Sequence, residues 1–95
     1  MSNEEFWGAH ELVEDLVTED YSWSAVGVFR RKSDGALFWA TDSGCSCYGT
    51  WEQITEADLT PFRDSKLMEF REDVKGVATE VEELQFIRDM EALLR

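Results

Sequence analysis

Two β-prone runs separated by a short turn stand near the centre of the sequence. Residues 21–31 read YSWSAVGVFRR and residues 36–41 read ALFWAT, and both are rich in aromatic and β-branched side chains. Between them lies KSDG, which ends in Asp34-Gly35. An Asp-Gly pair tolerates the positive φ angles that hairpin turns require. The sequence therefore predicts an antiparallel β-hairpin here.

The first of these runs has apolar side chains on both of its faces. In a strand, alternate residues point to opposite sides of the sheet. One face would hold Trp23, Ala25, Gly27 and Phe29, and the other Ser24, Val26, Val28 and Arg30. Because each face includes apolar residues, we expect helices to cover one side of the sheet and the other side to be partly shielded from solvent.

The N-terminal segment, residues 3–17, has the pattern of an amphipathic helix. Its apolar residues recur at spacings of three and four, and most of its acidic residues lie on the other side. Asn3 or Ser2 is placed to cap this helix. Glu4 and Glu5 suit the positive end of the helix dipole.

Two further helices are predicted near the C-terminus. Thr60-Pro61 offers a hydroxyl cap and a proline at the first helical position, and this helix would continue to about Lys75 and end at Gly76. The last helix begins at Thr79, which forms a capping box with Glu82. The residues expected to face the core are Leu67, Met68, Phe70 and Val74 in the first helix and Val81, Leu84, Ile87, Met90, Leu93 and Leu94 in the second.

These elements together predict an α+β fold. A small antiparallel sheet, built on the central hairpin, would pack against an N-terminal helix and two C-terminal helices. Residues 51–54 leave two interpretations open, a third short strand and a segment that only packs down. A length of 95 residues with 43% hydrophobic content fits a single domain over residues 1–95.

The charge of the chain is strongly negative. Acidic residues number 21 and basic residues 9, so the formal net charge is −12, and the first 29 residues contain no Lys or Arg. A field of this sign repels phosphate and disfavours direct binding to DNA or RNA. No stretch reaches the roughly 20 apolar residues of a membrane helix, and the start, MSNEEFW, lacks a signal-peptide pattern. We therefore expect a cytosolic protein with no membrane partner.

A loop at residues 41–52, TDSGCSCYGTWE, contains both cysteines of the chain. A zinc site needs about four ligands, which Cys45 and Cys47 supply only if two copies pool them across a dimer axis. A redox pair needs a lowered thiol pKa, and the flanking Asp42 and Glu52 act in the opposite direction. The favoured interpretation is that both cysteines fill space beside tryptophan rings. We therefore predict no cofactor, with Cys45 and Cys47 as weak candidates for a metal site.

His10 is the single histidine of the chain. Its place on the apolar stripe of residues 3–17 favours a hydrogen-bonded core residue over a catalytic base. No nucleophile elbow and no glycine-rich phosphate loop connects the other polar residues. The sequence therefore predicts a protein that is not an enzyme.

Residues 26–47, VGVFRRKSDGALFWATDSGCSC, together with Trp51-Glu52, resemble a group of small uncharacterised proteins from bacteriophages of actinobacteria. The matching elements are the strand, the Asp34-Gly35 turn, the run ATDSGCSC and Trp51-Glu52. In that group proline and serine commonly follow the second cysteine, whereas this chain has Tyr48-Gly49-Thr50. The resemblance implies a phage origin and, with it, the host bacterial cytoplasm as the working place.

Host-protein binding is the function that the charge and the resemblance together favour, with inhibition or modulation of the bound protein. A nucleic-acid enzyme or a defence complex presents a basic cleft, which an array of carboxylates would occupy as a mimic of DNA. The candidate array consists of Glu4, Glu11, Glu14, Asp15, Glu19 and Asp20. Two alternatives stay open, a structural or assembly protein of the virion and a Cys-x-Cys metal or redox site at a dimer interface.

A basic tip, Arg30, Arg31 and Lys32, lies beside the predicted turn. These three cations would either contact an acidic patch of a partner or protect a sheet edge from pairing with other chains. Edge protection is the favoured interpretation.

Overall fold

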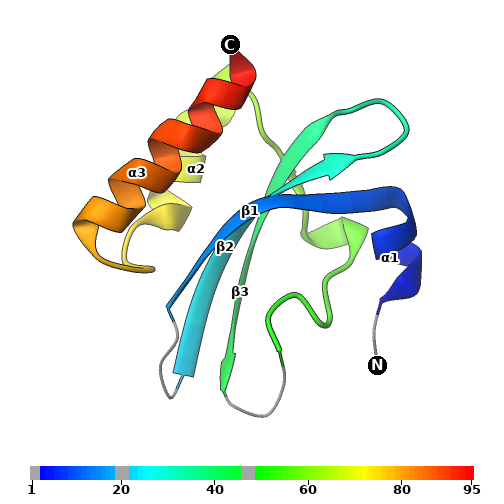
Figure 1. Ribbon diagram of the computed structural model, residues 1–95, viewed down its shortest axis with the longest axis horizontal. Helices are drawn as coiled ribbons and strands as arrows, with labels where there is room; N and C mark the ends of the chain where they lie inside the picture. The colour runs from blue at the N-terminus through cyan, green and yellow to red at the C-terminus, as the bar shows by residue number, and fades with distance from the viewer. Residues whose placement is uncertain (1–2, 19–21, 46–48) are drawn as a thin grey trace.

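The computed structural model describes residues 3–18, 22–45 and 49–95 (Figure 1). Its helices and strands are, in chain order, α1 (Glu4–Ala9), β1 (His10–Thr18), β2 (Ser22–Arg31), β3 (Leu37–Cys45), β4 (Thr60–Pro61), α2 (Leu67–Val74) and α3 (Glu80–Glu91). Short 3-10 turns occur at Glu56–Asp58, Asp64–Lys66 and Ala92–Leu94. The chain forms an antiparallel sheet, with α1 before it in the sequence and α2 and α3 after it, which confirms the predicted α+β fold. Within these ranges no helix has the length and apolar character needed to cross a membrane.

The predicted hairpin is confirmed as β2 and β3, joined by the turn that contains Asp34-Gly35. Gly35 has a φ of 76°, and its N–H donates to the carbonyl of Arg31 at 2.8 Å. The carboxylate of Asp34 accepts a hydrogen bond from the N–H of Ala36 at 3.1 Å. The glycine supplies the left-handed backbone and the aspartate holds the turn, as expected from their chemistry.

The sheet has the strand order β1-β2-β3-β4, so β1 and β4 form its edges. Both faces are covered, as the alternation along β2 predicted. On one face β2 and β3 pack against α2 and α3, and this helix-side core is formed by Val26, Val28, Trp39, Phe62, Phe70, Val74, Val77, Phe86 and Met90. On the other face lies the α1-side core, formed by Phe6, Trp23, Ala25, Phe29, Ala40, Trp51 and Ile54. Figure 1 shows α2 and α3 together, well apart from α1.

The predicted helix over residues 3–17 is wrong beyond its first turns, because α1 ends at Ala9. Asn3 does cap α1, and its side-chain oxygen accepts a hydrogen bond from the N–H of Phe6 at 3.3 Å. Residues 10–18 instead pair antiparallel with β2. The buried backbone of β2 needs hydrogen-bonding partners on both sides, and only a strand can provide them. This non-local demand overrides the helical spacing of the apolar residues.

The predicted helix start at Thr60-Pro61 is also wrong. These two residues form β4, which pairs with Phe38 and Trp39, and α2 begins only at Leu67. Proline has no N–H to donate, so an edge strand is a position that tolerates it. The next residue, Phe62, is 3% exposed and belongs to the helix-side core. Burial of this aromatic ring decides the path of the chain here.

Residues 51–54 pack against the sheet without forming a strand. Trp51 and Ile54 are each 4% exposed and complete the α1-side core. The side-chain amide of Asn3 donates to the carbonyl of Ile54, which ties this segment to the start of α1. The second of the two open interpretations is therefore confirmed.

The C-terminal helices follow their predicted boundary signals better than their predicted faces. Gly76, at φ 88°, follows α2, and Thr79 caps α3 by accepting from the N–H of Glu82 at 3.3 Å. The predicted inward positions are wrong at several places. Four residues that were predicted to face the core have largely exposed side chains, with exposed fractions of 80% for Met68, 78% for Val81, 58% for Leu84 and 38% for Leu93. Phe86, which was not predicted to face inward, is buried in the helix-side core.

Candidate functional site

Trp51 is held by two carboxylates that come from different strands. Its indole N–H donates to Asp15 Oδ2 of β1 at 2.8 Å, and its backbone N–H donates to Asp42 Oδ2 of β3 at 2.9 Å. The backbone of Trp51 has a φ of 65°, an uncommon value for a bulky residue. The two hydrogen bonds stabilise this conformation.

Gly27 of β2 makes room for the Trp51 ring. It lies opposite Asp15 in the sheet, and a Cβ at Gly27 would lie 2.7 Å from Cζ2 of Trp51. The indole therefore packs directly on the backbone of β2, with its polar edge toward Asp15. The absence of a side chain at Gly27 is what permits the bond between Trp51 and Asp15.

Trp39 is anchored in the same way on the other face of the sheet. It is 2% exposed, and its indole N–H donates to Asp73 Oδ2 of α2 at 2.9 Å. A buried indole N–H without an acceptor is costly, so this bond fixes both the ring and the carboxylate. Asp73 thereby also joins α2 to β3.

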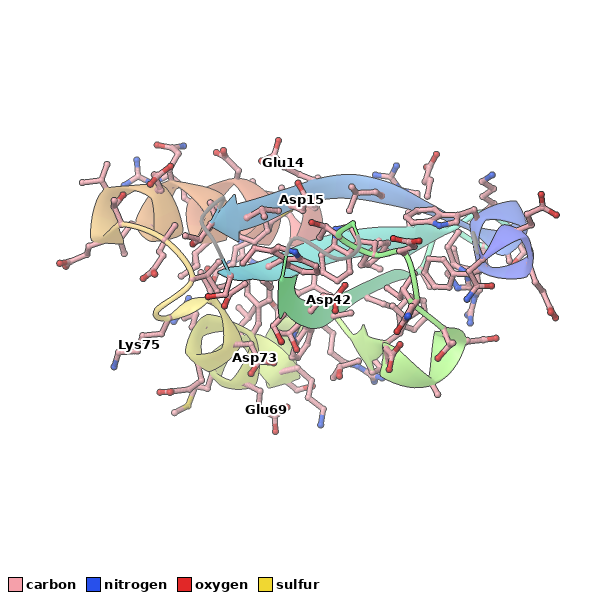
Figure 2. All side chains as sticks on the ribbon, turned by 90° about the horizontal axis from the view of Figure 1, so that it is seen from below. Glu14, Asp15, Asp42, Glu69, Asp73 and Lys75 are labelled. Carbon is pink, nitrogen blue, oxygen red and sulfur yellow. The ribbon has the colours of Figure 1, made fainter. Side chains whose placement is uncertain are left out.

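These three aspartates belong to an acidic band, which we define as Glu14, Asp15, Asp42, Asp73 and Glu69. Figure 2 shows the five labelled residues spread in this order from β1, at the top of the view, through β3 to α2 at the bottom. Glu69 pairs with Lys66 at 3.3 Å, and Lys75 lies to one side of the band in the same view. The band thus combines acids from three elements that are far apart in the sequence.

The four described acids of the predicted array do not lie on one helical face. Glu4 lies in the first turn of α1, and Glu11 of β1 pairs with Arg30 at 3.0 Å. Glu14 and Asp15 lie opposite Val28 and Gly27, so as neighbours in a strand they point to opposite faces of the sheet. The single helical face on which the array was predicted does not exist. The remaining members, Glu19 and Asp20, lie outside the described residues.

The cations of the basic tip are engaged in local contacts. Arg31 Nε and Nη2 lie 3.0 and 2.7 Å from the two carboxylate oxygens of Asp34. This bidentate hydrogen bonding lowers the pKa of Asp34 to about 2. Arg30 pairs with Glu11, and Lys32 Nζ donates to the carbonyl of Trp7 at 3.1 Å. The tip therefore stabilises the hairpin turn and its contacts with α1 and β1.

His10 is 3% exposed, and its Nδ1 lies 3.2 Å from the carbonyl oxygen of Phe6. Its ring stacks on that of Phe6, with centroids 4.5 Å apart. This is the hydrogen-bonded core position that was predicted for it. Its Nε2 has no hydrogen-bond partner among the described residues.

The proposed metal ligands cannot be placed, because Cys47 and the side chain of Cys45 lie outside the described part of the chain. Among the side chains that the structure does describe, no group of three or more His, Cys, Asp or Glu is arranged to hold a metal ion.

A protein-family model matches residues 2–95. The chain belongs to the family described as Domain of unknown function (DUF7574). No curated protein and no solved structure matches it. The geometry of this DUF7574 member is therefore the main source of information about its function.

Sequence reasoning missed three acids of the acidic band in the DUF7574 chain, namely Asp42, Glu69 and Asp73. A signal for one of them, Asp73, was present, since a buried tryptophan usually needs an acceptor for its indole N–H. Because the sequence has four tryptophans and 21 acids, this signal does not identify which acid accepts from which tryptophan. Only the packing of β3 against α2 joins Trp39 to Asp73.

Proposed function

We propose that this protein acts by binding another protein, and that its acidic band enters a basic cleft of that partner. The partner class that suits such a surface is a nucleic-acid enzyme or a defence complex of a bacterial host. The band would take the place of nucleic-acid phosphates and block the cleft. Inhibition then follows from occupancy alone and needs no chemical step.

The observation that carries this proposal is the anchoring of three carboxylates by two tryptophans. Asp15 and Asp42 are held by Trp51, and Asp73 is held by Trp39. A side chain that is already ordered loses less conformational entropy when a partner binds. Anchored acids therefore suit recognition better than the same number of freely rotating acids.

The overall charge supports the same proposal. A net charge of −12 steers a basic partner toward the protein and raises the association rate at low ionic strength. The resemblance of residues 26–52 to small phage proteins supports a bacterial host as the source of the partner. The burial of His10 favours a binding role over acid-base catalysis.

Capture of partners from a bacterial lysate, at low and at high salt, tests the proposal. The test variant carries Asp42→Asn, Glu69→Gln and Asp73→Asn, since an amide oxygen at positions 42 and 73 still accepts from the backbone N–H of Trp51 and the indole N–H of Trp39. Three lost ionic contacts of about 0.2–1 kcal/mol each should weaken binding roughly tenfold. We expect the captured proteins to bind DNA or RNA, and added DNA to release them.

The matched control carries Glu5→Gln, Glu56→Gln and Glu80→Gln. These three acids are exposed, lie outside the acidic band and remove the same number of charges. The control should capture the same partners as the unaltered protein. Equal capture by the band variant, or capture that high salt does not reduce, would show that the acidic band is not the binding surface.

A further inference from the structure

The outer edge of β1 is open. β1 comprises nine residues and pairs with β2 alone, since it stands at the end of the sheet order. No backbone hydrogen bond joins this outer edge to any residue in the described ranges. An edge strand offers a row of unpaired N–H and C=O groups, which is a template for another strand.

A groove runs beside this edge, between β1 and α3. Its volume is about 360 Å³, and its apolar lining comes from Leu16, Val81 and Phe86. Val81 projects from α3 and is 78% exposed. An apolar side chain entering the groove would bury Val81 and gain contact with Leu16.

The groove is also strongly acidic. Four carboxylates line it, Glu14, Asp15, Glu82 and Asp89, and no Lys or Arg does. None of the four takes part in an ion pair with a described residue. Asp15, Glu82 and Asp89 accept hydrogen bonds from neutral groups, which leave the charge of a carboxylate in place. The groove therefore attracts a basic ligand.

We propose that β1 and this groove bind an extended segment of a partner protein, in which the side chains that face the groove, at every second position, are apolar and Lys or Arg in turn. The segment adds to the sheet as a strand next to β1, so that main-chain hydrogen bonds supply affinity and alternate side chains supply specificity. Its apolar residues lie against Val81 and Leu16, and its cations approach Glu14 and Asp89. This inference rests on the proposed function and names the kind of segment through which the partner is held.

A second copy of this chain is a poorer occupant of the same edge. Its own β1 carries Glu11, Glu14 and Asp15 and no Lys or Arg. Pairing two such strands would place like charges close together, which is destabilising. The acids on β1 thus select a basic strand and reject an identical one.

The probe for this inference is the nine-residue peptide Thr-Val-Thr-Lys-Thr-Val-Thr-Lys-Thr, with blocked ends, which presents Val and Lys in turn on one face of a strand. Binding is measured by fluorescence anisotropy, and strand addition by amide hydrogen exchange of the protein followed by NMR. We expect the amides of β1 to gain at least about tenfold protection when peptide is present at millimolar concentration. A peptide of the same length with Pro in place of each Val should give no protection, because proline cannot donate to a sheet.

Paired variants locate the site. Val81→Ser and Glu14→Gln should each weaken peptide binding about 3- to 10-fold, by loss of apolar contact and of charge. Two control variants should change binding less than twofold: Leu84→Ser, at an exposed apolar residue of α3 outside this groove, and Glu5→Gln.

Three results would overturn the inference. The first is that the β1 amides stay unprotected at saturating peptide, and the second is that the proline peptide binds equally well. The third is that the protein sediments as a dimer whose outer β1 amides are protected without peptide. The proposed function fails separately, when Asp42→Asn, Glu69→Gln and Asp73→Asn leave partner capture unchanged, because none of these residues lines the groove.

Discussion

At the scale of single residues, the acids of this protein have two different tasks. Some are surface charges, such as Glu14, while others accept hydrogen bonds from buried or half-buried groups, such as Asp15 and Asp73. The second kind is structural and also keeps its charge at the surface. A net charge of −12 therefore includes carboxylates that the fold itself requires.

Gly27→Ala tests how closely Trp51 packs on β2. The added Cβ would meet the ring at 2.7 Å, and the ring is fixed by its bond to Asp15, so we expect a loss of about 1–3 kcal/mol in the free energy of unfolding. Urea denaturation followed by tryptophan fluorescence measures this. Gly8→Ala is the matched control, because a Cβ there has nothing within 4 Å and alanine favours a helix. Equal stability of the two variants would contradict the close packing.

At the scale of elements, the turn between β2 and β3 is held by charge as well as by backbone geometry. Arg31 and Asp34 form two hydrogen bonds, and Asp34 also accepts from the N–H of Ala36. These contacts favour the ionised carboxylate in the folded protein. Protonation of Asp34 at low pH should therefore weaken this turn.

The pKa of Asp34 should be about 2 when it is measured by NMR titration of the folded protein. Because this pKa lies below the ordinary value of about 3.9, the stability that the carboxylate contributes is present above pH ~4 and is lost as the pH falls toward 2. Arg31→Gln should move the pKa back toward the ordinary value, since Arg31 is the largest cause of the shift. Arg30→Gln, at the neighbouring position, should leave it low. A pKa of Asp34 that Arg31→Gln does not change would contradict this account.

At the scale of the whole molecule, the excess of 21 acids over 9 bases acts against compactness. Like charges are brought closer when the chain folds, and this repulsion opposes the burial of the two cores. Salt screens charges that lie more than about 10 Å apart at 0.1 M, whereas short ion pairs are screened less. The dependence of thermal stability on salt concentration therefore shows whether charge repulsion or ion pairing is the larger effect.

We expect the melting temperature to rise when NaCl is increased from 10 to 150 mM, because the Debye length falls from about 30 to about 8 Å. Thermal unfolding followed by circular dichroism measures this. KCl should give the same increase, which separates screening from specific ion binding. A melting temperature that falls over this range would mean that attractive pairs, such as Arg71 with Glu91, outweigh the repulsion.

The parts of the fold that were predicted correctly depend on residues close together in the chain. Asp34-Gly35 specifies its turn within four residues, and Thr79 with Glu82 starts α3 within one turn. The parts that were predicted wrongly involve distant partners. Residues 10–18 have helical spacing, yet they form a strand because β2 needs a neighbour.

The same division applies to the candidate site. The sequence alone determined the negative charge, the central hairpin and the caps of α1 and α3, because these follow from composition and from contacts of a few residues. Only the tertiary structure decided that Asp15 and Asp42 meet at Trp51, that Asp73 meets Trp39, and that β1 forms an open edge. Strand order and the packing of helices bring these groups together, and no local pattern encodes those long-range contacts.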